Sequence, residues 1–137
     1  RPMGLLIDTD VLILADRGKA ALDLGRFEAE GMAYISAITA SELLVGVHRA
    51  QDPAVRARRT AFVESLLAAL PALPVDLETA RVHAQLLAHL PAGEPMGAHD
   101  ALIGATAMRH GYAVLTRNVK DFRKLPGLRV LEYTVPA

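Results

Sequence analysis

Short, largely apolar runs alternate along this chain with longer segments in which apolar residues recur every three or four positions. The short runs span residues 5–7, 33–35, 112–115 and 128–131. Runs this short, without regular polar alternation, are typical of strands that are buried on both faces of a parallel sheet. The sequence therefore predicts four such strands.

The longer segments carry the spacing of helices. One covers residues 62–70, and another covers 101–109 and is followed by Gly111, which predicts a glycine C-cap. A third, over 77–90, has its apolar residues at Leu77, Ala80, Ala84, Leu87 and Leu90. Strands that alternate with helices predict an α/β fold around a mainly parallel sheet.

Carboxylates gather at one predicted edge of this sheet. In parallel sheets the functional crevice lies beyond the carboxyl ends of the strands. The acids in the segments that lie there are Asp8, Asp10, Glu42, Asp100 and Asp121. A charge among apolar residues is costly unless it is paired or bound to a metal, and no basic residue stands in the short motifs of Asp8 and Glu42. Because oxygen ligands favour Mg²⁺ or Mn²⁺ over zinc, the pattern predicts a hard divalent cation.

Each acid also has a plain structural interpretation. Asp8 could cap the helix that follows it, and Asp10 or Asp100 could complement a helix dipole. Glu42 could be a solvated helix residue, although its neighbours leave that helix little polar surface. Asp121 stands among basic residues and could be an ordinary surface acid. Their joint position at the strand ends is what favours a site.

Composition narrows the alternatives. The chain has no cysteine, which excludes disulfides, thiolate zinc sites and a cysteine nucleophile. It has no glycine-rich phosphate loop, and its histidines lack the spacing of a zinc site. No apolar run approaches the roughly 18–20 residues of a spanning helix, so we expect no membrane partner and a reduced, cytosolic setting. We expect one domain over residues 4–137, with Arg1-Pro2 a remnant ahead of an initiator Met3.

Four ordered segments resemble the motifs of PIN-domain nucleases, with the spacing of the VapC-type toxins of prokaryotic toxin–antitoxin pairs. They span residues 6–12, 36–43, 99–107 and 115–122, and the resemblance extends from Gly4 to about Glu132. It implies a three-layer α/β/α sandwich and a metal-dependent ribonuclease. It also implies a homodimer, an RNA substrate and a small VapB-like antitoxin whose C-terminal segment blocks the acidic pocket.

The resemblance assigns the core acids to Asp8, Glu42 and Asp100. It implies that Asp8 and Asp100 hold Mg²⁺, or Mn²⁺ in its place, while Glu42 binds a second ion or orients the attacking water. The family often has a fourth acid where this chain has Asn118. Asp121, three residues further on, either substitutes for that acid as a catalytic group or only flanks the site.

Two further residues are assigned supporting roles by the same resemblance. Asp10 stands where the family commonly has Asn, and it would orient Asp8 or bind the water shell of the metal. Thr116 would hydrogen-bond a metal ligand or a water.

The formal net charge of zero conceals a segregated distribution. The segment from residue 109 to residue 129 contains six Arg and Lys residues and a single acid, Asp121. Within it, Arg117 and Lys120 are candidates for contacts with an RNA backbone. A second basic stretch, over 49–59, has a solvated helix surface as an equal interpretation.

Two other functions remain open at this point. One is a catalytically weak PIN domain that serves as a binding or regulatory partner. The other is a receiver-type signalling domain, which needs an acceptor Asp after a central strand and a Lys after the last one. Neither of these residues stands in register.

Overall fold

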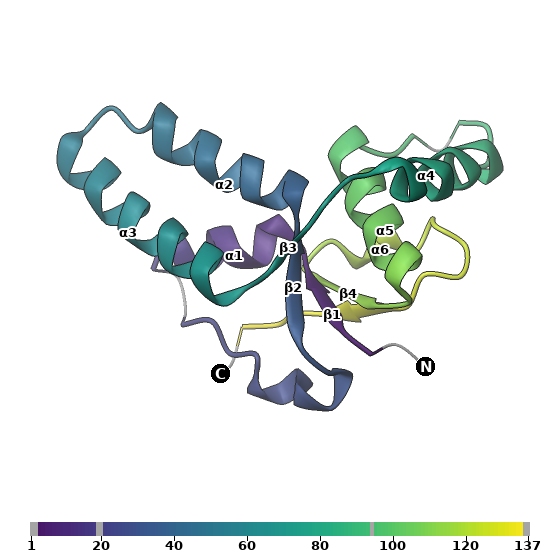
Figure 1. Cartoon of the computed structure of the whole chain (residues 1–137), viewed down its shortest axis with the longest axis horizontal. Helices are drawn as coiled ribbons and strands as arrows, with labels where there is room; N and C mark the ends of the chain where they lie inside the picture. Colours follow the sequence, from purple (N-terminus) through teal and green to yellow (C-terminus); the bar gives the residue numbers. More distant parts are fainter. Residues whose placement is uncertain (1–2, 19–20, 94, 136–137) are drawn as a thin grey trace.

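A sheet of five parallel strands, ordered β3-β2-β1-β4-β5, forms the centre of the computed structural model, which describes residues 3–18, 21–93 and 95–135 (Figure 1). The strands are β1 (Leu5–Ile7), β2 (Ala33–Ser36), β3 (Ala72–Leu73), β4 (Ala113–Thr116) and β5 (Val130–Glu132). Every described pairing is parallel, with Leu6 opposite both Tyr34 and Val114. The predicted α/β class with a mainly parallel sheet is therefore confirmed.

Helices cover both faces of the sheet. They are α1 (Thr9–Asp16), the 3-10 helix η1 (Gly25–Glu30), α2 (Ala37–Arg49), α3 (Pro53–Ala69), α4 (Leu77–His89), α5 (Ala98–His110) and α6 (Val119–Phe122). Figure 1 shows α2 and α3 as an antiparallel pair on one side of the strands, with α4 and α5 on the other.

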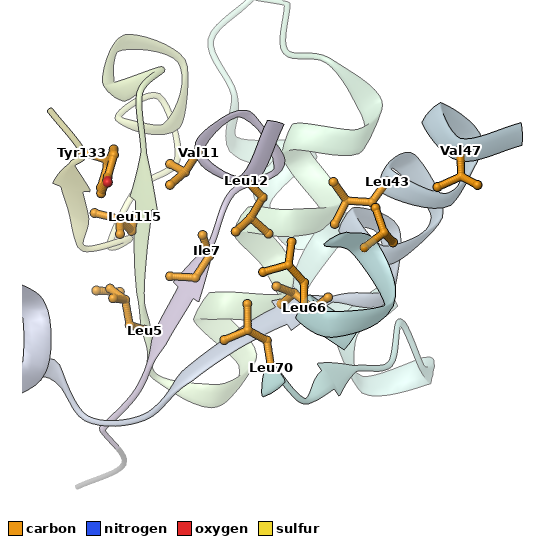
Figure 2. Packing of buried hydrophobic residues seen from close by; sticks show 13 residues of the cluster. Leu5, Ile7, Val11, Leu12, Leu43, Val47, Leu66, Leu70, Leu115 and Tyr133 are labelled. Carbon is orange, nitrogen blue, oxygen red and sulfur yellow. The ribbon is translucent and has the colours of Figure 1, made fainter. Parts of the chain in front are cut away.

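Each face of the sheet has its own hydrophobic core. Successive residues of a strand point to opposite faces, so neighbouring residues belong to different cores. Leu5 and Ile7 pack against the helices α1, α2 and α3, and Figure 2 shows Leu12, Leu43 and Leu66 in this layer. Leu6 faces the other way, where it packs with residues of α5 and α6. These two cores confirm the three-layer α/β/α sandwich.

The structure places several element boundaries differently from the sequence pattern. The strands predicted to start at residues 112 and 128 begin at Ala113 and Val130, and the helix predicted over 62–70 already begins at Pro53. The sequence pattern missed β3, η1 and α6, which are too short to display a period. The predicted C-cap is confirmed, because Gly111 adopts a left-handed conformation with φ 74° and its N–H bonds back into α5.

The helix predicted over 77–90 is present, but most of the apolar stripe that predicted it faces solvent, and of its residues Leu90 packs against the core. Leu77 is 65% exposed and Leu87 is 43% exposed, and Ala80 and Ala84 between them are exposed as well. The helix instead packs through a neighbouring face that includes Leu86. One side of α4 is therefore an apolar surface in contact with solvent.

The strand order decides against the receiver-type alternative. Receiver domains share the order 2-1-3-4-5 of flavodoxin-like folds, whereas this sheet runs β3-β2-β1-β4-β5. Among the described residues no helix is long and apolar enough to cross a membrane. Arg1 and Pro2, which we expect to precede the native start, lie outside the described residues.

Candidate active site

The predicted site lies where three adjacent strands end. β1 ends at Ile7 and Asp8 follows it, β2 leads into α2, and β4 ends at Thr116. The Asp8 N–H donates to the Leu115 carbonyl over 2.9 Å, which extends the contact between β1 and β4 to the edge of the sheet. Asp8 and Thr116 are thereby held next to each other on the two central strands.

Asp8 is buried, and each of its carboxylate oxygens accepts one hydrogen bond. It is 4% exposed, its Oδ1 accepts from the Thr9 N–H over 2.8 Å, and its Oδ2 accepts from the Thr116 hydroxyl over 2.7 Å. The first bond makes Asp8 the N-cap of α1, so the structural interpretation of this residue is correct. Burial, followed by the negative charge of Asp10, raises the pKa of Asp8 to about 7. A helix cap alone does not require a carboxylate that is so costly to ionise.

Glu42 lies on α2 and faces the start of α1. Its Oε1 is 2.6 Å from the Thr9 hydroxyl, and its Oε2 is 3.2 Å from His99 Nδ1. The Glu42 side chain is 32% exposed, so the carboxylate stands at the boundary between the protein and the solvent. The solvated-helix interpretation of Glu42 therefore does not describe its environment.

Asp100 completes the convergence from the first turn of α5. It is half-buried, and burial raises its pKa, with further contributions from the negative charges of Asp121, Glu42 and Asp10 in that order. Asp10 itself accepts from the Arg117 N–H over 3.3 Å. The negative charges of acids from three other segments thus act on Asp100.

The fourth acidic position is occupied by a pair of residues. The Asn118 side chain donates from Nδ2 to Asp121 Oδ2 over 2.8 Å, and Lys124 Nζ lies 3.2 Å from Asp121 Oδ1. These bonds lower the pKa of Asp121. Asn118 therefore orients the Asp121 carboxylate at the margin of the site. The negative charge of Asp121 contributes there to the raised pKa of Asp100.

Five of the basic residues between positions 109 and 129 fall into two groups. Arg109, Lys124 and Arg129 each form an ion pair, with Asp76, Asp121 and Glu30 respectively. Arg117 and Lys120 are exposed, and neither forms an ion pair with any described residue. These two side chains are therefore available to an external anion beside the carboxylates.

The donor set fits a hard divalent cation that keeps much of its water. Within the described ranges, no three Asp, Glu or His side chains are placed to hold one ion together. No described Lys or Arg pairs with Asp8, Asp10 or Asp100 either, so no such side chain offsets the repulsion between these acids. Mg²⁺ typically binds proteins through one or two carboxylates and retains several waters. Asp8 and Asp100 offer that number of ligands.

Sequence reasoning missed four residues of this site. They are Thr9, Thr39, His99 and Lys124, each of which contacts a predicted site residue or its immediate partner. Thr39 precedes Glu42 by three positions, a spacing that places both on one face of a helix. That spacing was the available signal for Thr39, whereas the other three contacts depend on how separate elements meet.

Comparison with known proteins agrees with this fold. A family model for the PIN domain matches residues 5–128, and the chain therefore belongs to the PIN-domain family, whose ribonucleases are generally metal-dependent. Over 130 residues the chain is 41% identical to Ribonuclease VapC1 of Rickettsia felis, which covers 94% of this chain and 96% of the relative. These matches place it among the VapC-type ribonucleases.

A less similar relative and a solved structure also bear the names VapC and VapBC. The tRNA(fMet)-specific endonuclease VapC of Shigella flexneri is 29% identical over 131 residues, covering 94% of this chain and 97% of that protein. The DNA-bound VapBC structure from Salmonella typhimurium contains a chain that superimposes with a TM-score of 0.85 at 28% identity, covering 96% of this chain and 99% of its own.

Proposed function

We propose that this chain is an Mg²⁺-dependent endoribonuclease that acts as the toxin of a VapB–VapC-type pair. The observation that carries the proposal is Asp8, a buried carboxylate with a pKa raised to about 7 that faces other acids without a described Lys or Arg partner. Ionising such a group costs the fold stability, whereas a cation site uses an ionised carboxylate as a ligand.

The carboxylates have separate roles in this proposal. Asp8 and Asp100 hold the cation, with Mn²⁺ able to replace Mg²⁺, and Thr116 fixes the Asp8 carboxylate by its hydrogen bond. When bound, the cation supplies Lewis-acid polarisation of the phosphodiester. Glu42 orients the attacking water and accepts its proton at Oε2, the oxygen that faces His99 at the exposed side of the carboxylate. The donors on both Glu42 oxygens favour this role over binding a second ion.

The substrate is RNA, held beside the carboxylates through its backbone. Arg117 directly follows β4, and its backbone N–H already contacts Asp10. Lys120 lies one turn further on, in α6. Two exposed cations at this place suit phosphate contacts on either side of the scissile bond.

A VapB-like antitoxin is the partner that the relatives support. Solved chains with this fold come from complexes of VapB with VapC, including those of Salmonella typhimurium and Mycobacterium tuberculosis. We infer that the C-terminal segment of such an antitoxin covers the carboxylate cluster and thereby excludes RNA.

We also infer that two copies of the chain pair through α4. Its exposed stripe is palindromic about position 82, with Leu77 and Leu87 at the ends and Ala80 and Ala84 inside. A two-fold axis there sets Leu77 of one copy against Leu87 of the other, and Ala80 against Ala84. A symmetric contact requires such self-complementarity, and the alanines allow the helices to approach closely.

RNA cleavage by the purified chain tests the activity. We expect a total tRNA fraction or ribosomal RNA to be cut in Mg²⁺, with cleavage lost in EDTA. Asp8→Asn and Asp100→Asn should each remove it, whereas Glu64→Gln, a matched change of an exposed acid on α3, should not. Cleavage at the wild-type rate by Asp8→Asn would contradict the proposal. A different outcome would support a binding role: the chain is toxic when expressed, a co-expressed VapB-like antitoxin relieves the toxicity, and the purified chain cleaves no RNA.

A further inference from the structure

One residue, Thr9, contacts two acidic residues that come from different parts of the chain. Its backbone N–H donates to Asp8 Oδ1 over 2.8 Å, and its hydroxyl lies 2.6 Å from Glu42 Oε1. Asp8 and Glu42 are thirty-four positions apart in the sequence, and Thr9 is 5% exposed between them. The two carboxylates are thus held against opposite ends of a single buried residue.

The direction of the hydroxyl bond follows from the chemistry of the partners. The Thr9 hydroxyl also lies 2.9 Å from the Thr39 hydroxyl, but it carries only one proton. An ionised carboxylate can only accept, so Thr9 donates to Glu42 and the fully buried Thr39 donates to Thr9. The Thr39 bond leaves the Thr9 oxygen a single orientation in which its proton reaches Glu42 Oε1.

Thr9 is well suited to set a fixed spacing. It is the first residue of α1, directly after the residue that caps this helix, so its backbone is fixed by Asp8. Its branched side chain has few χ1 positions, and the hydroxyl of Thr39 selects among them. His99 is the other described side chain with a polar contact to Glu42, and it approaches the opposite oxygen from the exposed side.

We infer that Thr9 is a positioning residue that fixes the Glu42 carboxylate relative to Asp8. The inference rests on the proposed function, in which Asp8 holds the cation and Glu42 orients the attacking water. Thr9 acts through Glu42 and does not itself touch the RNA. Its hydroxyl therefore sets the rate of cleavage and leaves RNA binding nearly unchanged.

The experiment compares Thr9→Val with Thr9→Ser, alone and combined with Glu42→Gln, in saturating Mg²⁺. Valine keeps the shape of threonine without the donor. We expect Thr9→Val to lower kcat roughly 10–100-fold, as for the loss of a hydrogen bond to a charged group, with KM changed by less than about threefold. Thr9→Ser should stay within about fivefold of the wild type, because it keeps the hydroxyl.

The Glu42→Gln background separates positioning from a general structural role. If Thr9 acts through Glu42, adding Thr9→Val to Glu42→Gln lowers kcat by less than about twofold, because coupled residues are not additive. A full further loss in the double variant would overturn the inference. Thr39→Val is the matched control: it removes another buried hydroxyl of the same cluster but leaves Thr9 able to donate, and its loss should be smaller than that of Thr9→Val.

Crystal structures provide the readout that does not depend on activity. In Thr9→Val the Glu42 carboxylate should leave the place it occupies in the wild type, and in Thr9→Ser it should stay. A Glu42 that keeps its position in Thr9→Val overturns the inference even if the enzyme is slow. A wild-type chain that cleaves no RNA, or an unimpaired Glu42→Gln, contradicts the proposed function instead, while the structures still decide the role of Thr9.

Discussion

The hydroxyl of Thr116, the last residue of β4, donates a 2.7 Å hydrogen bond to Oδ2 of Asp8, the residue that follows β1. The same hydroxyl oxygen accepts from the Asn118 N–H over 2.8 Å, so Thr116 joins the buried carboxylate to the start of α6. Asp8 has no described Lys or Arg beside it, and this hydroxyl and the Thr9 N–H are the two donors that favour its charged form.

Replacing Thr116 should therefore affect stability and activity together. We expect Thr116→Val to destabilise the fold by about 1–3 kcal/mol, because it leaves the Asn118 N–H without its acceptor and Asp8 without a donor. Cleavage of RNA should fall as well, since Asp8 becomes harder to ionise. Thr116→Ser keeps both hydrogen bonds and should retain most of both properties. Urea denaturation at pH 8 and a cleavage assay measure the two effects, and equal behaviour of the two variants would contradict the role of the hydroxyl.

The raised pKa of Asp8 predicts that removing its charge stabilises the protein at alkaline pH. In the unfolded chain Asp8 ionises near its usual value of 3.8, and in the folded chain near 7. The folded state therefore binds the proton more tightly, and the Asp8 contribution to stability falls as the pH rises from about 4 to 7. Below pH 4 both states are protonated and this difference disappears.

Asp8→Asn should accordingly be more stable than the wild type at pH 8.5 and lose most of that advantage by pH 4. We expect a gain of about 2 kcal/mol, less than the roughly 4 kcal/mol that a pKa raised to about 7 represents, because the amide disturbs the bond from Thr116. Urea titrations at both pH values measure the difference, with Glu64→Gln as the exposed control. A variant less stable than the wild type at pH 8.5 would mean that the hydrogen bonds outweigh the charge.

Cation binding should be visible without any substrate. Mg²⁺ that binds the folded state through Asp8 and Asp100 relieves their repulsion and raises the melting temperature. For a Kd of about 1 mM we expect a rise of about 5 °C at 10 mM Mg²⁺ and pH 8. The rise should shrink at pH 5.5, where a proton competes with the cation for Asp8, whose pKa is raised to about 7. Calorimetry of the wild type, Asp8→Asn and Asp100→Asn tests this, and equal shifts in all three would place the ion elsewhere.

Particular residues show how far the sequence determines this site. The apolar runs that end at Ile7 and Leu115 identify two strand ends, and in a parallel sheet these ends must meet, so the proximity of Asp8 and Thr116 follows from pattern alone. Asp100 lies at the start of the crossover helix that leads into β4, and such a helix runs antiparallel to the strands and starts at the same edge of the sheet. The contact between Thr9 and Glu42 does not follow, because it depends on the packing of α1 against α2. The choice between Asn118 and Asp121 depends on α6, a single turn that is too short to produce a pattern.

Asp121 and Asp100 should differ in importance by more than an order of magnitude. Both oxygens of Asp121 already contact donors from Asn118 and Lys124, whereas no side chain in the described part of the chain donates to Asp100 in this way. We expect Asp100→Asn to lower kcat more than about a thousandfold and Asp121→Asn about tenfold or less. Asp121→Asn also removes a negative charge that raises the pKa of Asp100, so the acidic limb of its pH–rate profile should move to lower pH. An Asp121→Asn variant as inactive as Asp100→Asn would make Asp121 a catalytic residue.

The exposed stripe of α4 gives a prediction for the oligomeric state that is independent of the chemistry. In an antiparallel pairing about position 82, Ala84 lies near the middle of the contact, about 3 Å along the helix from the axis. Ala84→Arg places a long cation there in both copies and should convert the dimer into monomers. Gln85→Arg adds the same side chain to the next position, which is exposed but turned about 100° away, and should leave the dimer intact. Sedimentation equilibrium distinguishes the two, and a dimer that survives Ala84→Arg would exclude α4 as the contact. Because α4 precedes α5, which carries Asp100, the monomeric variant also reveals by its rate of RNA cleavage whether each copy contains a complete site.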